Sequence, residues 1–171
     1  DAEAHNNLGV TQRELGRLCE AEDSFKRAIA SNPGFVRGYS NLGVTQQELG
    51  RLDEAEENHM QAIALESDSA EAHYNLGITL KDSGKLDAAE VSFRKAIKLK
   101  SGYAEAYAHM GYTLQDLGRL GESESCFRQA ITFAPDCASK YLDLCQFLET
   151  TNNLEGVLLV IKDARERLDA Q

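Results

Sequence analysis

The chain has 171 residues, 42% hydrophobic and 27% charged, which is typical of a folded protein rather than a disordered one. Eighteen basic and 28 acidic residues give a net charge of −10, which disfavours nucleic acid and anionic membranes as partners, and no apolar run approaches the roughly 20 residues of a membrane span. The four cysteines lack the paired spacing of a disulfide framework or a zinc site, so we expect reduced thiols and a cytoplasmic location.

The first predicted helix contains a twelve-residue phrase that returns three more times along the chain. The four copies read NLGVTQRELGRL (7–18), NLGVTQQELGRL (41–52), NLGITLKDSGKL (75–86) and HMGYTLQDLGRL (109–120). Each copy begins 34 residues after the previous one. A fixed period of this length indicates a solenoid of stacked units.

Each unit is predicted to contain two helices separated by a glycine. Apolar and small residues recur at steps of three and four and should form a buried face on the first helix; in the first unit these are Ala4, Leu8, Thr11 and Leu15. Gly16 and its copies should end that helix, because glycine readily adopts the left-handed conformation. Gly9 lies in the middle of the same helix, where glycine costs roughly 1 kcal/mol relative to alanine, so we expect a close helix contact there.

The last segment, residues 138–171, continues the period but loses the phrase. We interpret it as a degenerate fifth helix pair that caps the array of residues 1–137. Its run Val157, Leu158, Leu159, Val160, Ile161 is apolar on every side, more than one packed face needs. Either a downstream domain or a second copy of the chain should cover it, so Val157, Leu158, Leu159 and Val160 are candidates for self-association.

The repeated phrase, the glycine, the Leu-x-x-Ala opening of the second helix, the aromatic residue and the Ala-Ile pair together resemble the tetratricopeptide repeat (TPR). The resemblance covers four units, 2–35, 36–69, 70–103 and 104–137. It implies an all-α fold, a right-handed solenoid of antiparallel helix pairs (an α-α superhelix) with its first helices along a concave groove. His59 replaces the usual aromatic residue and is expected to be a buried, neutral imidazole.

Residues 3, 7, 10 and 14 share one stripe of the first helix, away from its buried faces, and so do their equivalents in the later units. Asn7, Asn41 and Asn75 line up on this stripe, and an amide suits the backbone of an extended peptide because it both donates and accepts. This asparagine ladder is similar to that of the TPR region of O-linked N-acetylglucosamine transferases, where aligned asparagines hold a peptide backbone. The alternative is a purely structural role for the three amides.

The same stripe carries seven acidic residues and a single basic one, so we expect the groove to prefer neutral or basic peptides. The alternative is a solvated acidic face on an acidic protein. Besides the three asparagines, the predicted contact residues are Arg37, Glu48, Tyr74, Ile78, Asp82, His109, Tyr112 and Asp116.

No catalytic constellation, phosphate-binding glycine loop or metal-ligand spacing stands out, so we expect no enzyme, no cofactor and no metal. The sequence favours a non-catalytic module that binds a protein or an extended peptide. One alternative is the substrate-recognition region of a larger TPR-containing glycosyl-, sulfo- or methyltransferase. Another is a self-assembling scaffold, a homo-oligomer joined through the C-terminal helix or the open ends of the solenoid.

Overall fold

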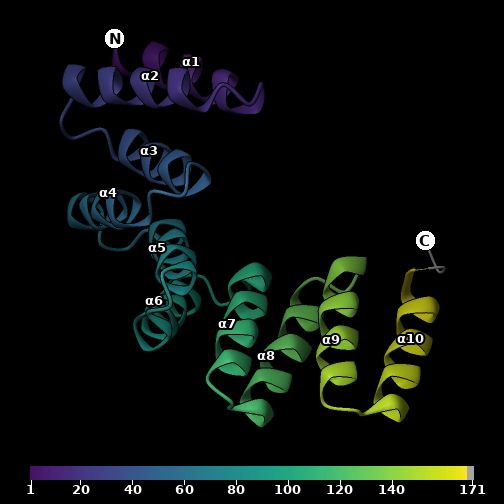
Figure 1. Cartoon of the computed structure of the whole chain (residues 1–171). Coiled ribbons are helices and arrows are strands. Elements are labelled where there is room, and N and C mark those ends of the chain that lie inside the picture. Colours follow the sequence, from purple (N-terminus) through teal and green to yellow (C-terminus); the bar gives the residue numbers. More distant parts are fainter. Residues whose placement is uncertain (169–171) are drawn as a thin grey trace. The chain divides into compact units, whose positions relative to one another are not determined.

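The computed structural model describes residues 1–168, and these form ten α-helices and no strand (Figure 1). The predicted all-α solenoid of helix pairs is confirmed; the last three residues of the predicted cap lie outside the described residues. The helices are α1 (Ala2–Glu14), α2 (Leu18–Ser31), α3 (Val36–Glu48), α4 (Leu52–Leu65), α5 (Ala70–Asp82), α6 (Leu86–Leu99), α7 (Ala104–Asp116), α8 (Leu120–Phe133), α9 (Ala138–Thr150) and α10 (Leu154–Leu168).

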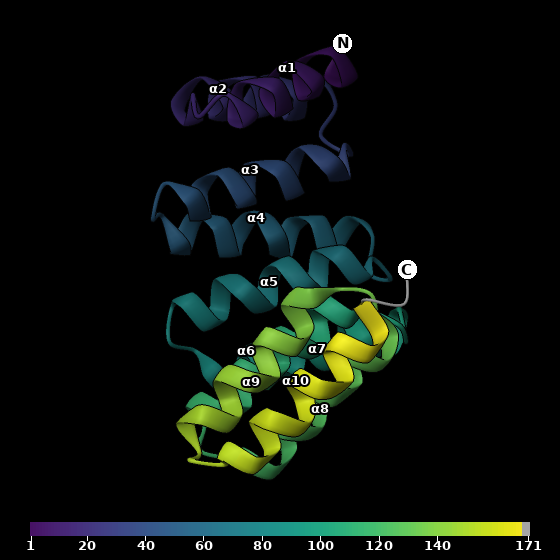
Figure 2. The same ribbon diagram turned by 90° about the vertical axis from the view of Figure 1, so that its right-hand side faces the viewer.

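The helices pack as two compact units. The first unit is Asp1–Leu99 and holds α1 to α6; the second begins at Lys100 and holds α7 to α10. In the first unit each helix packs on the next, and α1 also contacts α3 while α3 contacts α5. Figure 2 shows the pair α1 and α2, then α3, then α4 as successive layers of this unit. The first helices of neighbouring pairs therefore lie side by side along one wall.

Each first helix ends at a residue in the left-handed region. Gly16, Gly50, Gly84 and Gly118 have φ values of 73° to 76°, as predicted. Two backbone amides at this turn bond to the last carbonyls of the helix. The N–H of Gly16 donates to the carbonyl of Arg13 at 2.9 Å, and that of Arg17 donates to the carbonyl of Gln12 at 2.9 Å. Asn152 occupies the same place in the fifth pair with φ 57°. The fifth pair therefore keeps the turn without the glycine.

The mid-helix glycines make room for an aromatic ring rather than for a second backbone. A Cβ placed on Gly9 would lie 2.6 Å from the ring of Phe25, and one on Gly77 would lie 2.6 Å from the ring of Phe93. Gly43 faces the imidazole of His59 in the same way, at 2.6 Å. The predicted close contact is confirmed. In each of these repeats the ring of a second-helix residue packs directly on a glycine of the first helix and so holds the two helices together.

His59 is buried and neutral, as predicted. Its side chain is fully buried and neither ring nitrogen has a hydrogen-bond partner among the described residues. Burial lowers the pKa of this imidazole to about 4, because nothing nearby compensates a charge there.

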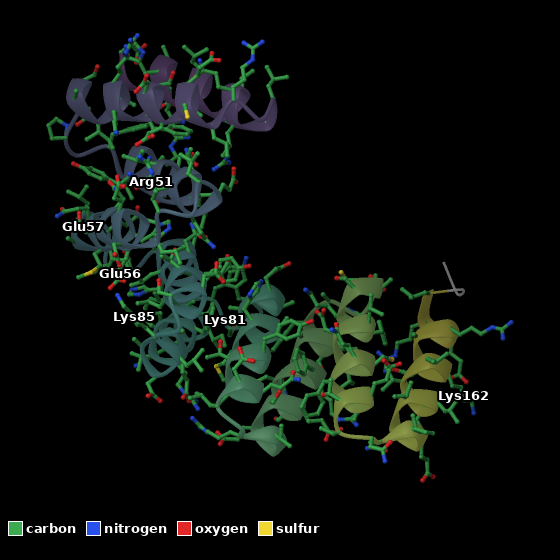
Figure 3. The ribbon with its side chains drawn as sticks, in the orientation of Figure 1. Arg51, Glu56, Glu57, Lys81, Lys85 and Lys162 are labelled. Atoms are coloured by element: carbon green, nitrogen blue, oxygen red, sulfur yellow. The ribbon has the colours of Figure 1, made fainter. Side chains whose placement is uncertain are left out.

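Salt bridges join consecutive repeats of the first unit (Figure 3). Glu22 pairs with Lys26 at 2.7 Å and with Arg51, which directly precedes α4, the second helix of the next repeat. One repeat later, Glu56 pairs with Lys85 at 2.7 Å. Burial of Glu22 disfavours its charge, but hydrogen bonds from Lys26 and Arg51 outweigh that effect and hold its pKa below the usual value. The repeated pairing helps to set the register between neighbouring repeats.

The predicted buried face of the first helix is wrong for α1. Leu8 is 49% exposed and Leu15 is 64% exposed, and Ala4 and Thr11 are exposed as well. The equivalent Leu42 of α3 is buried against Phe25, because α2 of the preceding repeat covers it. No described helix covers that side of α1.

The apolar run of α10 is divided between core and surface, which corrects the expectation that all of it is available for self-association. Val157 and Val160 are buried in a core with Phe127, Leu144 and Phe147. The exposed members of the run are Leu158, Leu159 and Ile161, with exposures of 69%, 64% and 53%. None of the helices in residues 1–168 is long and apolar enough to cross a membrane.

Candidate peptide-binding site

The asparagine ladder, defined as Asn7, Asn41 and Asn75, lies on α1, α3 and α5, the three first helices of the first unit. Asn7 is exposed, and Asn41 and Asn75 are half-buried. The side-chain amides of Asn7 and Asn75 make no hydrogen bond to another described residue. The fold therefore leaves these two amides within reach of solvent on α1 and α5, the helices on either side of α3.

The middle rung is partly engaged by the protein itself. The Asn41 amide donates through Nδ2 to Oδ1 of Asn6 at 2.8 Å. Asn6 is 3% exposed, so this bond satisfies a buried acceptor between α1 and α3. Sequence reasoning missed Asn6; the signal was a second asparagine directly before the first rung, one repeat and one residue from Asn41.

The charges of the stripe are also partly paired across repeats. Arg37 donates through Nη2 to both carboxylate oxygens of Glu3 at 2.8 Å, so its charge is not available alone to a ligand. Asp82 accepts a hydrogen bond from Gln47 at 2.7 Å. Glu48 and Glu71 are exposed on α3 and α5. The stripe in the first unit is therefore acidic once the Arg37–Glu3 pair is set aside.

The remaining predicted residues of the first unit form a partly apolar floor. Ile78 is half-buried on α5. Tyr74 is half-buried too, and its ring lies 6.1 Å from that of Phe93, centroid to centroid. Tyr74 thus presents only part of its surface to a ligand.

The other predicted contacts, His109, Tyr112 and Asp116, belong to α7 of the second unit. The Tyr112 hydroxyl donates to Asp143 on α9 at 2.7 Å, and its ring meets Phe127 edge-on at 4.9 Å. Burial, and then the bond to Asp143, raise the pKa of Tyr112 well above its ordinary value. This tyrosine ties α7 to α9 and α8. Asp116 is exposed, and His109 is half-buried with its ring 6.5 Å from that of Tyr112, centroid to centroid.

The described residues contain no group of three His, Cys, Asp or Glu side chains placed to hold a metal ion. Cys19, Cys126, Cys137 and Cys145 are free thiols. The asparagines and acidic residues of the stripe place amides and carboxylates on the first helices, an arrangement suited to hydrogen bonding and charge recognition.

Models of the tetratricopeptide repeat match residues 2–35, 36–102 and 104–137. The chain belongs to the tetratricopeptide repeat family. Its fold is that of a protein-interaction module.

Solved TPR proteins share the fold at low sequence identity. MamA is 24% identical with a TM-score of 0.80, over 95% of either chain. TTC0263, a thermophilic TPR protein of Thermus thermophilus, is 23% identical with a TM-score of 0.79, over 98% of this chain and 91% of its own. YrrB, described as a TPR protein with an unusual peptide-binding site, is 20% identical with a TM-score of 0.71, over 97% and 86%. Among curated proteins, none matches the chain in a sequence comparison.

Proposed function

We propose that the chain is a non-catalytic module that binds an extended peptide along the first helices, with the asparagine ladder contacting the peptide backbone. The observation that carries this is the placement of Asn7 and Asn75 in the same slot of α1 and α5, with side-chain amides that make no hydrogen bond to another described residue. With packed helices about 8–10 Å apart, three rungs span roughly 20 Å, which an extended strand covers with about six residues. In this proposal α1, α3 and α5 of the first unit carry the binding.

The bound peptide would be neutral or basic. Glu48 and Glu71 are exposed on the same stripe, and Asp82 lies there too and accepts a hydrogen bond from Gln47. A peptide lysine or arginine near these acids gains attraction, mainly in capture rate and register, and salt screens that gain.

The test is binding of an array of random peptides of about ten residues to the intact chain and to Asn7→Ala/Asn75→Ala. This pair spares Asn41, whose removal would strip a buried acceptor of its partner. We expect capture to fall about 5- to 30-fold, the equivalent of two lost hydrogen bonds of about 0.5–1 kcal/mol each. The matched control is Gln61→Ala/Gln129→Ala, which removes two exposed amides from second helices.

Equal capture by the wild type and the ladder variant would overturn the proposal. The charge claim is read from the same array at low and high salt. It predicts a preference for lysine-containing peptides that shrinks as salt rises, and a preference for acidic peptides would contradict it.

A second candidate function is self-association through α10, favoured by the exposure of Leu158, Leu159 and Ile161. Exposed apolar side chains gathered on one helix are a common feature of contact surfaces between proteins. Light scattering of wild type and Leu159→Glu would test it: the wild type should be larger than a monomer and the variant monomeric. A monomer in both cases would exclude self-association.

A further inference from the structure

A hollow lies in the first unit, on the side of the second helices. It runs between α4 and α6 with α5 as its floor, and its volume is about 420 Å³. Met60 and Ile63 of α4, His73 and Leu76 of α5, and Val91 and Lys95 of α6 line it. We call these six residues the outer groove. It opens because the first helices lie side by side while the second helices spread apart around them.

The fold makes a groove of this kind more than once. The six slots recur 68 residues later as Arg128, Ile131, Tyr141, Leu144, Leu159 and Asp163, and all six line a cavity of about 500 Å³ within the second unit. The backbone therefore provides the hollow, and the residues in its slots decide what it can bind.

The rim of the outer groove is more apolar than the fold requires. Met60 is 56% exposed and Val91 is 68% exposed. One repeat earlier the same two slots hold Lys26 and Glu57, in helices that pack in the same way. The packing of the repeat thus accepts charge in both slots, and apolar side chains there need another explanation.

One end of the groove is basic in a chain whose net charge is −10. Lys95 lines it and Lys98 follows three residues later on α6. Neither ammonium forms an ion pair with another described residue. In the second unit the slot of Lys95 holds Asp163, which pairs with Arg167 at 2.8 Å, so the unpaired ammonium of Lys95 has no counterpart in that slot.

We propose that the outer groove binds an amphipathic helix of a partner protein, with aliphatic side chains placed over Met60 and Val91 and carboxylates facing Lys95 and Lys98. The row of side chains along one helix fits the furrow between two others, which is the geometry that α4 and α6 offer. Charge complementarity selects an acidic helix, the opposite of the peptide proposed for the ladder. The two sites share α5 but have no residue in common, so either can fail without the other.

The experiment uses four labelled helical peptides in fluorescence anisotropy with the intact chain. Two carry leucines at positions i, i+4 and i+7 and two carry serines there, and each type is flanked either by glutamates or by lysines. We expect the leucine–glutamate peptide to bind with a Kd of about 10–100 μM and the other three at least about tenfold more weakly. No binding of that peptide up to about 1 mM would overturn the proposal.

Each variant takes the residue found at the equivalent position of another repeat in the same chain, so that folding is preserved. Met60→Lys/Val91→Glu installs the pair found at Lys26 and Glu57 and should weaken binding at least about tenfold. The matched control is Leu158→Glu, an exposed apolar residue of α10 in the slot where the first four helix pairs hold glutamate. This control and Asn7→Ala/Asn75→Ala should leave binding unchanged, and circular dichroism confirms that each variant is folded.

The charge component is tested by Lys95→Gln/Lys98→Ala, which takes the residues found at Gln61 and Ala64 one repeat earlier. Binding of the leucine–glutamate peptide should fall toward that of its lysine-flanked counterpart, and its salt dependence should largely disappear. An unchanged preference, or equal binding by the Met60 and Val91 variant, would show that the peptide binds elsewhere and would overturn the assignment.

Discussion

At the scale of single residues, the contact between a glycine and a ring decides whether a unit can close. The Cβ of an alanine at position 77 would lie 2.6 Å from the ring of Phe93, closer than such atoms pack, and that ring is fully buried with no room to retreat.

Gly77→Ala should therefore destabilise the fold by about 1–3 kcal/mol despite the better helix propensity of alanine. Urea unfolding followed by circular dichroism measures the change. Gly121→Ala in α8 is the control, since nothing lies within 4 Å of a Cβ there; it should be neutral or stabilising by up to about 1 kcal/mol. Equal effects of the two substitutions would contradict the contact argument.

His59 makes stability depend on pH, because its folded-state pKa of about 4 is below its unfolded value of 6.5. Above the unfolded value neither state is protonated and the contribution is complete. As pH falls from about 6.5 toward 4 only the unfolded state gains a proton, so stability is lost by about 3 kcal/mol in order of magnitude.

His59→Phe restores the ring found at Phe25 and Phe93 and should remove this pH dependence. The measurement is the free energy of unfolding of both proteins near pH 7.5 and near pH 5. The stability of the variant relative to the wild type should be greater at the lower pH. An equal difference in the free energy of unfolding at both pH values would rule out the buried histidine as the source of the pH dependence.

At the scale of the helix pair, the left-handed turn between the two helices is kept even where the rest of the repeated phrase is lost. The fifth pair lacks the phrase yet keeps the left-handed residue, with Asn152 at φ 57° where the second unit's other pair has Gly118 at φ 75°. Asparagine tolerates this conformation better than other residues that carry a Cβ, but glycine adopts it without strain.

Asn152→Gly should accordingly stabilise the protein by about 0.5–1 kcal/mol, and Asn152→Ala should destabilise it by about 1 kcal/mol. Thermal melts of the three proteins under one condition would show the order glycine, asparagine, alanine. If alanine proved as stable as asparagine, the left-handed turn at residue 152 would be refuted.

The fifth pair also shows what happens when the glycine and the ring are both lost. Cys145 stands in the glycine slot and Ile161 in the ring slot. Cys145 is half-buried, burial raises the pKa of its thiol, and Ile161 is 53% exposed. Val157 and Val160 supply the packing instead, which is why an apolar run with no clear face proved to be half core.

At the scale of the whole molecule, the helices, their turns and the buried His59 could be predicted because they follow from local pattern repeated in register. The exposure of Leu8 could not, since burial depends on a neighbouring helix that a pattern cannot supply. Nor could the engagement of Asn41 by Asn6 or of Tyr112 by Asp143, because side-chain bonds between helices need coordinates. The outer groove was missed for the same reason: its lining comes from three helices, and no short motif marks it.

The glycine and the ring that rests on it are only sixteen positions apart, inside one 34-residue stretch, as in Gly9 and Phe25. A tandem duplication of such a stretch copies the glycine and the ring together. Each added repeat therefore brings its own complete contact between its two helices. Because a substitution at either position alone disrupts the contact, we expect the two positions to change together in evolution.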